Sequence, residues 1–511
     1  MRVYTLLLTT TASAILYGVS FPPAGLRLLA WVALAPFFVA VRRGRLPTAL
    51  VLGWVWTVVM AYVVGDWFPR SISTYYGQPA WVGIAFFFGV SSLLAAPYYM
   101  AFVVVYRRLA RMWRAPLPLL AGAAWAGAEL ARVRLGGNPW ALSGYSQIGM
   151  DPLVQIADVT GVYGLCFLLG AVNAALVELW LARGDRQRWH TALRGAAGVT
   201  GALAIGLGYG VVRLRADLID RQAAPVRVAM VQANLDLGAQ WRQEFYGRNL
   251  DVHLQLTHQV LSEHRPQLVF WPENALTFFL ADEPLYRASI ARVLWPSGAQ
   301  LVTGGLRTDG GGDPRYYNSV FLLSPRGDIL GTYDKKKLLP FAEYFPLPRL
   351  EGLVRRFARA RTLTPGESQP LLETTAGPAG VTICNEAMFP EFAAARVHAG
   401  AGFLVDPAND TWLTPAFSAQ QFEIVSLRAI EQRRYIVRAS TAGPSAIVDP
   451  YGHVLIRTKF FERAAIAGEI RAGAIVTPYC RTGDLFGLLC AIIALAACVA
   501  PAVRRAATES E

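Results

Sequence analysis

Long apolar runs constrain this chain more than any other feature of its sequence. Eight runs approach or exceed the length of about 20 residues that a bilayer-spanning helix needs. They are residues 4–18, 28–41, 48–68, 80–105, 116–130, 161–182, 196–212 and 485–503. The chain has 511 residues, of which 54% are hydrophobic and only 16% are charged, which excludes a soluble single-domain enzyme. We therefore expect a polytopic α-helical membrane domain with about eight transmembrane helices.

Arginines cluster in every second loop between these runs. The basic loops contain Arg42, Arg43 and Arg45, then Arg107, Arg108, Arg111 and Arg114, then Arg183, Arg186, Arg188 and Arg194, while Arg504 and Arg505 follow the last run. Basic loops are cytoplasmic under the positive-inside rule. We thus expect seven helices in residues 1–213, an extracytoplasmic domain in residues 214–480, and a last helix with a short cytoplasmic tail in residues 481–511.

The same loops account for the formal net charge of +13. Residues 214–480 contain 28 Lys and Arg against 26 Asp and Glu, whereas the rest of the chain contains 20 against 9. A basic chain can indicate a nucleic-acid partner. Here the excess cations lie where membrane topology requires them, so we expect no nucleic acid.

The five cysteines point to one candidate nucleophile. Cys166, Cys490 and Cys498 lie in apolar runs, and Cys480 lies just before one. Their spacing fits neither a metal site nor a disulfide framework, and we expect no metal and no cofactor. Cys384 is the only thiol inside the polar part of the chain, although an isolated cysteine is more often a core residue.

The polar interval alternates short β-rich runs with helical stretches. The expected strands are residues 226–231, 267–270, 300–303, 320–323, 381–384 and 403–405, and the expected helices are residues 251–263, 390–398 and 419–433. About 250 residues with this alternation predict a layered α/β domain.

Three of the expected strand ends carry reactive groups. Glu273 follows Trp271 and Pro272, where partial desolvation suits a carboxylate to accept a proton. Lys335 opens a run of three lysines that ends in an apolar stretch, and one ammonium facing a pocket could stabilise an oxyanion. The alternative for the lysines is a solvated charge run. Cys384 is the third group.

A carboxylate, an ammonium and a thiol in this order make an activated nucleophile. The carboxylate takes the thiol proton, the thiolate attacks a carbonyl carbon, and the ammonium stabilises the tetrahedral oxyanion. Each motif alone is weak, but the three together predict covalent catalysis.

The order Glu273, Lys335 and Cys384 resembles the nitrilase superfamily, and further fragments resemble its membrane-embedded apolipoprotein N-acyltransferases. The fragments are Gly144-Tyr145-Ser146-Gln147, Val231-Gln232-Ala233-Asn234 with Trp241, Trp271-Pro272-Glu273, Tyr316-Tyr317-Asn318-Ser319, the run from Tyr333 to Glu343, Ile383-Cys384 with Glu386, and Asn409-Asp410 with Trp412. The chain departs from the usual family residues at Asn385 (Tyr), Ala342 (Gly), Leu413 (Phe) and Thr441 (Asn).

The resemblance implies an αββα sandwich for the polar domain and acyl transfer in two steps. Cys384 would attack the sn-1 ester of a phospholipid such as phosphatidylethanolamine, with Glu273 as base and Lys335 as oxyanion donor. The thioacyl enzyme would then acylate the α-amine of a diacylglyceryl-cysteine on an apolipoprotein. Such a protein would be a monomer in the bacterial inner membrane, with its catalytic domain on the periplasmic side.

The resemblance also implies supporting roles near the three groups. Glu343 would hold and tune the site, and Glu386 would support it from behind, although a surface carboxylate remains the alternative for Glu386. The change at Asn385 could alter acceptor handling or rate. Trp241 could belong to a lid, but a tryptophan is more often part of a core.

Two segments of the polar domain combine apolar residues with a place near the reactive groups. Residues 275–280 follow Glu273, and residues 350–357 add arginines to an apolar stretch, as in loops that dip into a membrane interface. The alternative is that both are ordinary core segments.

Two other functions stay open at this point. The trio alone equally fits a membrane-anchored amidase that uses water, although eight spans exceed what an anchor requires. A transporter would need ionisable residues within the spans, and Glu129, Arg132, Arg134 and Glu178 lie only near span ends.

Overall fold

The computed structural model describes residues 2–112, 114–216, 223–235, 243–345, 362–368, 370–411 and 414–509. The chain separates into two compact units. One comprises Met1–Ser73, Gln78–Ala216 and Thr482–Glu511, and the other comprises Thr74–Gly77 and Asp217–Arg481.

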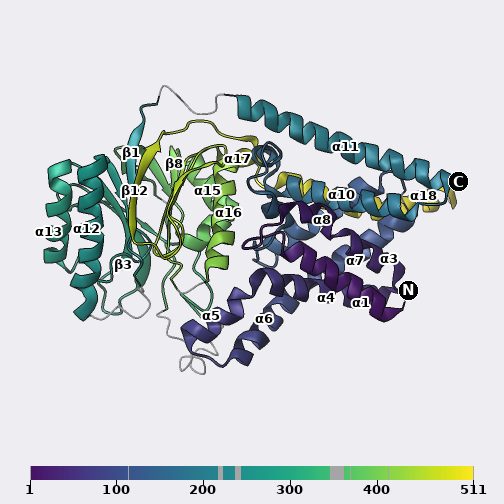
Figure 1. Ribbon diagram of the computed structural model, residues 1–511, viewed down its shortest axis with the longest axis horizontal. Coiled ribbons are helices and arrows are strands. Elements are labelled where there is room, and N and C mark those ends of the chain that lie inside the picture. Colours follow the sequence, from purple (N-terminus) through teal and green to yellow (C-terminus); the bar gives the residue numbers. More distant parts are fainter. Residues whose placement is uncertain are drawn as a thin grey trace. The chain divides into compact units, whose positions relative to one another are not determined.

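The first unit is helical (Figure 1). Its helices are α1 (Val3–Gly18), α2 (Ala30–Ala33), α3 (Ala35–Arg43), α4 (Leu46–Gly65), α5 (Trp67–Tyr76), α6 (Ala80–Leu94), α7 (Ala96–Met112), α8 (Leu117–Arg134), α9 (Ala157–Thr160), α10 (Val162–Leu181), α11 (Arg186–Arg215) and α18 (Leu485–Glu509). Within the described ranges, four stretches are long and apolar enough to cross a membrane, namely Leu46–Gly65, Ala80–Met112, Val162–Leu181 and Arg186–Arg215. Val3–Gly18 and Leu485–Ala500 are shorter apolar helices.

Small residues set how closely the helices of this unit pack. A Cβ atom at Gly122 of α8 would lie 2.5 Å from the carbonyl oxygen of Phe167 on α10, so only glycine permits this approach. The fourth expected span is divided at Ala95 into α6 and α7. Pro97 accounts for the division, because proline lacks the backbone N–H that would continue the helix and fits the first turn of a new one.

The second unit contains, within its described residues, two six-stranded sheets. The first has the order β12-β1-β2-β3-β4-β5, and the second has the order β11-β10-β9-β8-β7-β6. The strands of the first sheet are β1 (Val226–Gln232), β2 (Leu268–Phe270), β3 (Gln300–Thr308), β4 (Tyr316–Leu323), β5 (Ile329–Asp334) and β12 (Ala464–Ile470). Those of the second are β6 (Leu372–Thr374), β7 (Gly377–Val381), β8 (Phe403–Ala408), β9 (Ile436–Ser440), β10 (Ala446–Val448) and β11 (Val454–Arg457).

Each sheet has three parallel strands in the middle and antiparallel strands at its edges. The strands β1, β2 and β3 are parallel, with β12, β4 and β5 antiparallel to their neighbours. The strands β7, β8 and β9 are parallel in the same way. Parallel strands bring their carboxyl ends to one edge of a sheet, which is where α/β folds place their chemistry.

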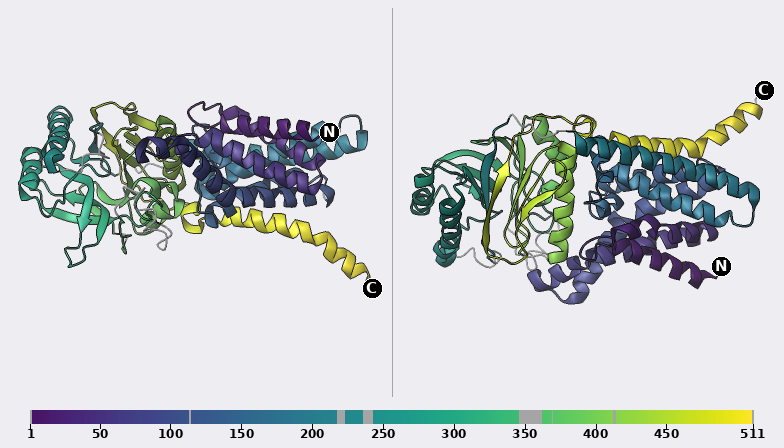
Figure 2. Two further views of the ribbon diagram at one scale, coloured as in Figure 1. Left: turned by 90° about the horizontal axis from the view of Figure 1, so that it is seen from below. Right: turned by 45° about the horizontal axis from the view of Figure 1, so that its top comes forward.

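The two sheets pack face to face between two layers of helices. Phe270 of β2 and Phe403 of β8 meet in the core with ring centroids 6.4 Å apart. The helices α12 (Tyr246–His264) and α13 (Pro284–Leu294) cover the outer face of the first sheet, and α15 (Pro390–His398) and α16 (Pro415–Gln432) cover that of the second (Figures 1 and 2). The unit is therefore an αββα sandwich.

Most helices and strands predicted from the sequence for this unit are present, but one strand ends earlier than expected. The expected strand at residues 381–384 ends at Val381, and Cys384 instead opens a 3-10 turn, η7 (Cys384–Met388). The strand prediction was wrong at its end because the Glu386 carboxylate accepts a hydrogen bond from the Ile383 backbone N–H at 2.8 Å, which turns the chain out of the sheet.

Candidate active site

The three predicted reactive residues each follow a strand. Glu273 lies three residues after β2, Lys335 comes directly after β5, and Cys384 lies three residues after β7. Glu273 and Lys335 belong to the first sheet, whereas Cys384 belongs to the second. The site is thus built where corresponding edges of the two stacked sheets meet.

The chain after β2 closes tightly on the neighbouring strand. The Gly304 backbone N–H donates to the Pro272 carbonyl oxygen at 3.2 Å, and the Leu276 N–H donates to that of Gly304 at 3.0 Å. A Cβ atom at position 304 would lie 2.7 Å from Glu273 Cα. Glycine at this position is therefore what lets the Glu273 backbone sit against β3.

Lys335 joins two carboxylates inside the domain. Its Nζ lies 3.2 Å from Oε1 of Glu273 and 2.9 Å from Oε1 of Glu343, and its side chain is only 2% exposed. Burial disfavours the charged ammonium, but the attraction of Glu273 and then of Glu343 outweighs it and raises the pKa of Lys335 above its usual value. The ammonium therefore keeps its charge.

Asn318 fixes the two carboxylates to each other. Its Nδ2 donates to Oε1 of Glu273 at 2.7 Å and to Oε1 of Glu343 at 2.8 Å. The second oxygen of each carboxylate accepts a backbone N–H, from Asn409 on Glu273 at 2.9 Å and from Leu339 on Glu343 at 2.7 Å. In the sequence, Asn318 stands out only as part of a motif. The two backbone donors could not be predicted, because any residue type supplies a backbone N–H.

Cys384 is buried in a strained backbone conformation. Its φ of 53° lies in the left-handed region that non-glycine residues rarely adopt, and such strain is concentrated at functional sites. Burial raises the pKa of the thiol well above its usual value, the negative charge of Glu273 raises it further, and Lys335 and the Asn409 backbone lower it. The resting sulfur is therefore a neutral thiol.

Glu386 connects the cysteine turn to the lysine loop. Its Oε1 accepts the backbone N–H groups of Lys336 at 2.7 Å and Lys337 at 2.9 Å, while Oε2 accepts that of Ile383. The Tyr333 hydroxyl donates to the same carboxylate at 2.9 Å. Glu386 is fully buried, so the surface alternative does not apply, and burial raises the pKa of its carboxyl against these hydrogen bonds.

The structure places Asn385 and residues 275–280, whereas two other predicted parts of the site lie outside the described residues. Asn385 donates from Nδ2 to the carbonyl oxygen of Lys337 at 3.0 Å, while its Oδ1 has no hydrogen-bond partner among the described residues. Trp241 and residues 350–357 lie outside the described part of the chain. Residues 275–280 are mostly core, since Phe278 is 1% exposed and packs in the first sheet's outer cluster, so their lipid-facing interpretation was wrong.

A candidate metal centre is not found within the part of the chain that the structure describes, where no group of three or more His, Cys, Asp or Glu side chains is suitably placed. The groups that converge on Lys335 are a carboxylate pair and a thiol. Such a set can move a proton and form a covalent bond to carbon, as nucleophilic catalysis requires.

Comparison with known proteins finds two matching family models. Residues 13–175 match the Apolipoprotein N-acyltransferase N-terminal domain, and residues 227–477 match the Carbon-nitrogen hydrolase family. The second match and the αββα layers together show that this half of the chain has the nitrilase-like fold.

Individual relatives extend over almost the whole chain. A Geobacter metallireducens protein named apolipoprotein N-acyltransferase is 33% identical over 494 residues, which cover 94% of this chain and 92% of that protein. An Azotobacter vinelandii protein of the same name is 31% identical over 487 residues, covering 93% and 91%. Among solved structures, Saccharomyces cerevisiae Nit3, a member of branch 10 of the nitrilase superfamily, is 20% identical over 50% of this chain and 93% of that chain, with a TM-score of 0.39.

Proposed function

Because this chain belongs to the apolipoprotein N-acyltransferase family, we propose that it transfers an acyl chain from a phospholipid to the α-amino group of the diacylglyceryl-cysteine of apolipoproteins. The observation that carries the proposal is the buried Lys335 ammonium held between the Glu273 and Glu343 carboxylates, in a domain that also buries the Cys384 thiol after a strand of its second sheet. That arrangement supplies a base, an oxyanion donor and a nucleophile in one place.

The first step loads the enzyme. Glu273 takes the proton of the Cys384 thiol as the sulfur attacks the carbonyl carbon of the sn-1 ester. Two contacts of the Lys335 ammonium go to Glu273 and Glu343, which leaves a third N–H to donate to the tetrahedral oxyanion. The ester C–O bond then breaks, and the leaving lysophospholipid oxygen takes the proton back from Glu273.

The second step unloads it. The lipoprotein α-amine attacks the thioester carbon and gives its proton to Glu273. The C–S bond breaks, the product leaves as an amide, and the Cys384 thiolate takes the proton from Glu273. Both steps use the same Lys335 donor, so the enzyme returns to its resting state without a cofactor.

The neighbouring residues have supporting roles in this proposal. Glu343 keeps Lys335 charged and fixed in position, and Glu386 holds the cysteine turn against the lysine loop. Asn385 contributes to handling of the incoming acceptor, and its Oδ1 has no hydrogen-bond partner among the described residues.

We further propose that the protein is a monomer in the bacterial inner membrane. It spans the membrane eight times, with residues 1–213 carrying seven helices and residues 481–511 the eighth and a cytoplasmic tail. The catalytic domain, residues 214–480, faces the periplasm, where phosphatidylethanolamine-like donors and diacylglyceryl apolipoproteins meet. The arginines in alternate loops and the apolar helices support this topology.

Intact-mass spectrometry of the purified protein tests the transferase. Incubation with phosphatidylethanolamine alone should add one acyl mass that neutral hydroxylamine releases. The adduct should be absent in Cys384→Ser and retained in Cys480→Ser, which changes a buried cysteine of the same domain away from the site. A diacylated lipopeptide with a free α-amine should discharge the adduct as a triacylated peptide.

The hydrolase alternative predicts a different decay. An amidase-like enzyme would lose the acyl mass to free fatty acid at one rate with or without lipopeptide. That result, or an adduct that persists in Cys384→Ser, would refute the proposed transfer.

A further inference from the structure

A buried charge pair lies behind Cys384, between the second sheet and α16. Asp406 on β8 and Arg438 on β9 are direct partners in the parallel ladder, so both side chains point to one face. It is the face of Leu404 and Ile436, which pack in the cluster shared with α15 and α16. Gln421 of α16 meets the pair there, and all three polar side chains are at most 1% exposed.

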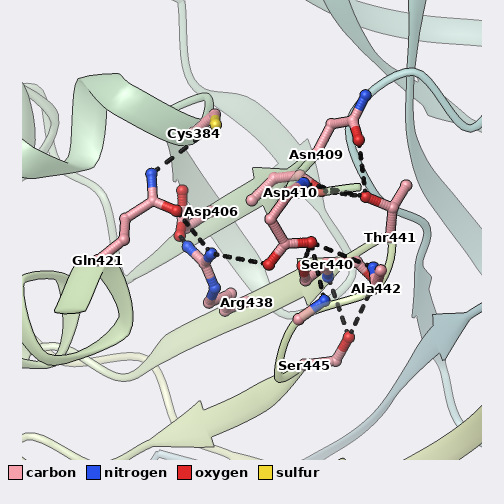
Figure 3. Close-up of polar contacts among 12 residues, drawn as sticks. Cys384, Asp406, Asn409, Asp410, Gln421, Arg438, Ser440, Thr441, Ala442 and Ser445 are labelled. Atoms are coloured by element: carbon pink, nitrogen blue, oxygen red, sulfur yellow. Dashed lines mark hydrogen bonds and ion pairs between the residues drawn. The ribbon is translucent and has the colours of Figure 1, made fainter. Parts of the chain in front are cut away.

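The Gln421 carboxamide connects this pair to the sulfur (Figure 3). Its Oε1 accepts a hydrogen bond from Nη2 of Arg438 at 2.9 Å, and its Nε2 lies 3.8 Å from Sγ of Cys384. A guanidinium has only donors, so Arg438 requires the oxygen of the amide on its side. The Gln421 N–H group is consequently forced to face the sulfur.

Arg438 itself cannot turn away. It forms an ion pair with Asp406, and its Nη2 lies 4.0 Å from a carboxylate oxygen of Asp410. Asp410 is held in turn by the Ser440 hydroxyl at 2.7 Å and by the Gly443 backbone N–H at 2.8 Å. Two carboxylates and one guanidinium are costly to bury, and their ion pairs and hydrogen bonds to one another and to the backbone offset that cost and fix their positions.

We propose that Gln421 is a further catalytic residue, a fixed hydrogen-bond donor to the Cys384 sulfur, and that Arg438 and Asp406 are positioning residues that hold its amide in the donating orientation. A donor at this place favours the thiolate over the thiol, because a thiolate accepts hydrogen bonds more strongly. The network thereby counteracts the burial and the carboxylate charge that oppose ionisation of Cys384.

The donor contributes at two moments of the reaction. It stabilises the thiolate that forms when Glu273 removes the thiol proton, and again the thiolate that leaves when the thioester carbon–sulfur bond breaks. In the thioacyl state the sulfur carries little charge, so the same contact is weaker. The gain therefore arises at the transition states, where it raises rate rather than substrate affinity.

This inference rests on the proposed nucleophilic role of Cys384, but its test reads the thiol without lipid or lipoprotein. The full-length protein is labelled with iodoacetamide between pH 7 and 10, and labelling of Cys384 is followed by peptide mass spectrometry. The charged groups that act on this sulfur are Glu273, Lys335, Asp406 and Arg438, and they are unchanged in the Gln421 variants.

Gln421→Met keeps the side-chain length without the donor, and Gln421→Glu replaces the donor with an acceptor. We expect alkylation of Cys384 to slow about tenfold in the first variant and more in the second, since a hydrogen bond to a charged group is lost. In both variants the labelling rate should be lower than in the native protein at every pH between 7 and 10, because a smaller fraction of the thiol is ionised. In lipid assays kcat should fall while KM stays unchanged.

Arg438→Lys tests the positioning role. It retains the charge but not the planar fork, so the amide can rotate and labelling should slow in the native background. In the Gln421→Met background the same change should have little further effect, because Arg438 acts through Gln421. Arg428→Lys is the matched control, since Arg428 is also buried and pairs with Glu431 on the same helix.

Labelling of Cys384 at the native rate in folded Gln421→Met would overturn the proposal, as would equal slowing in Arg428→Lys or additive effects of the two changes. If Gln421→Met does not fold because it leaves Nη2 of Arg438 without its acceptor, Gln421→Glu decides the matter, since it keeps that acceptor and removes only the donor. Labelling of Cys384 at the native rate in folded Gln421→Glu would overturn the proposal. Absence of acyl transfer in the native protein, together with slower labelling in the Gln421 variants, would instead argue against the proposed function alone.

Discussion

Glu386→Gln is the change for which the structure predicts the sharpest outcome. The carboxylate accepts hydrogen bonds on both oxygens, from Lys336 and Lys337 on one and from Ile383 on the other, while Tyr333 donates to both. A glutamine has one acceptor oxygen and one NH₂ group. Whichever way the amide is placed, its NH₂ group faces at least one backbone N–H.

The smaller loss of stability occurs when the NH₂ group faces the Ile383 backbone N–H. In that orientation the Tyr333 hydroxyl can rotate to accept a hydrogen bond from the NH₂ group. One charge-assisted hydrogen bond is lost and one buried N–H is left without a partner, which costs about 1.5–3 kcal/mol. The neutral amide recovers part of the desolvation cost of the carboxylate. We therefore expect a net destabilisation of about 2 kcal/mol, or about 4–8 °C in melting temperature for a domain of this size.

Thermal unfolding of the purified protein in detergent measures this change. Glu373→Gln is the control, because Glu373 is an exposed carboxylate on β6 and should leave the melting temperature within about 1 °C. Acyl-adduct formation should also slow in Glu386→Gln, since the affected backbone groups flank both Cys384 and Lys335. Equal melting temperatures for the two variants would refute the reasoning.

Three further predictions concern the oxyanion donor, the pH dependence of stability and the membrane topology. Lys335→Ala should lower the rate of adduct formation by about 10²–10³, whereas alanine at either following lysine should leave much of it, and equal losses at all three would show that the donor is misassigned. Burial raises the pKa of Asp406 to about 6 in the folded protein, from 3.8, so the folded state holds this proton more tightly and stability should fall by about 3 kcal/mol as pH rises from 4 to 7. Asp406→Asn should abolish that slope in melting experiments, and an unchanged slope would contradict the shift. Topology reporters fused at Arg188 and at Arg221 should report opposite sides of the membrane, and the same side for both would overturn the proposed orientation.

The sequence was sufficient for the fold class wherever periodicity and apolar length decide it. Apolar runs predicted the helices, and the alternation of short β-rich runs with helical stretches predicted the layered domain. The family resemblance is confirmed by matches that extend over most of the chain. Eight membrane spans and the roles of Glu273, Lys335 and Cys384 stay predictions, because they concern lipid and chemistry rather than chain geometry.

What the sequence could not supply was pairing between distant side chains. Nothing near Asn318 indicates that its amide joins Glu273 to Glu343 across two loops. In the sequence, Gln421 and Arg438 look like ordinary residues of a helix and a strand. The hydrogen bond between them could not be predicted, because it depends on how the strands of the sheet are aligned and on how the helix packs against them. The turn at Cys384 was missed for a local reason, because the Glu386 carboxylate two residues later accepts the Ile383 backbone N–H and ends the strand.

The high pKa of the Cys384 thiol has a consequence for how fast this protein is damaged by oxidation. Peroxide oxidises cysteine through the thiolate, so a sulfur held as a neutral thiol forms sulfenic acid slowly. Under the proposed mechanism the thiolate is present only during turnover, when Glu273 removes the thiol proton. A resting molecule should therefore survive an oxidising environment, and damage should accumulate with the number of catalytic cycles rather than with time.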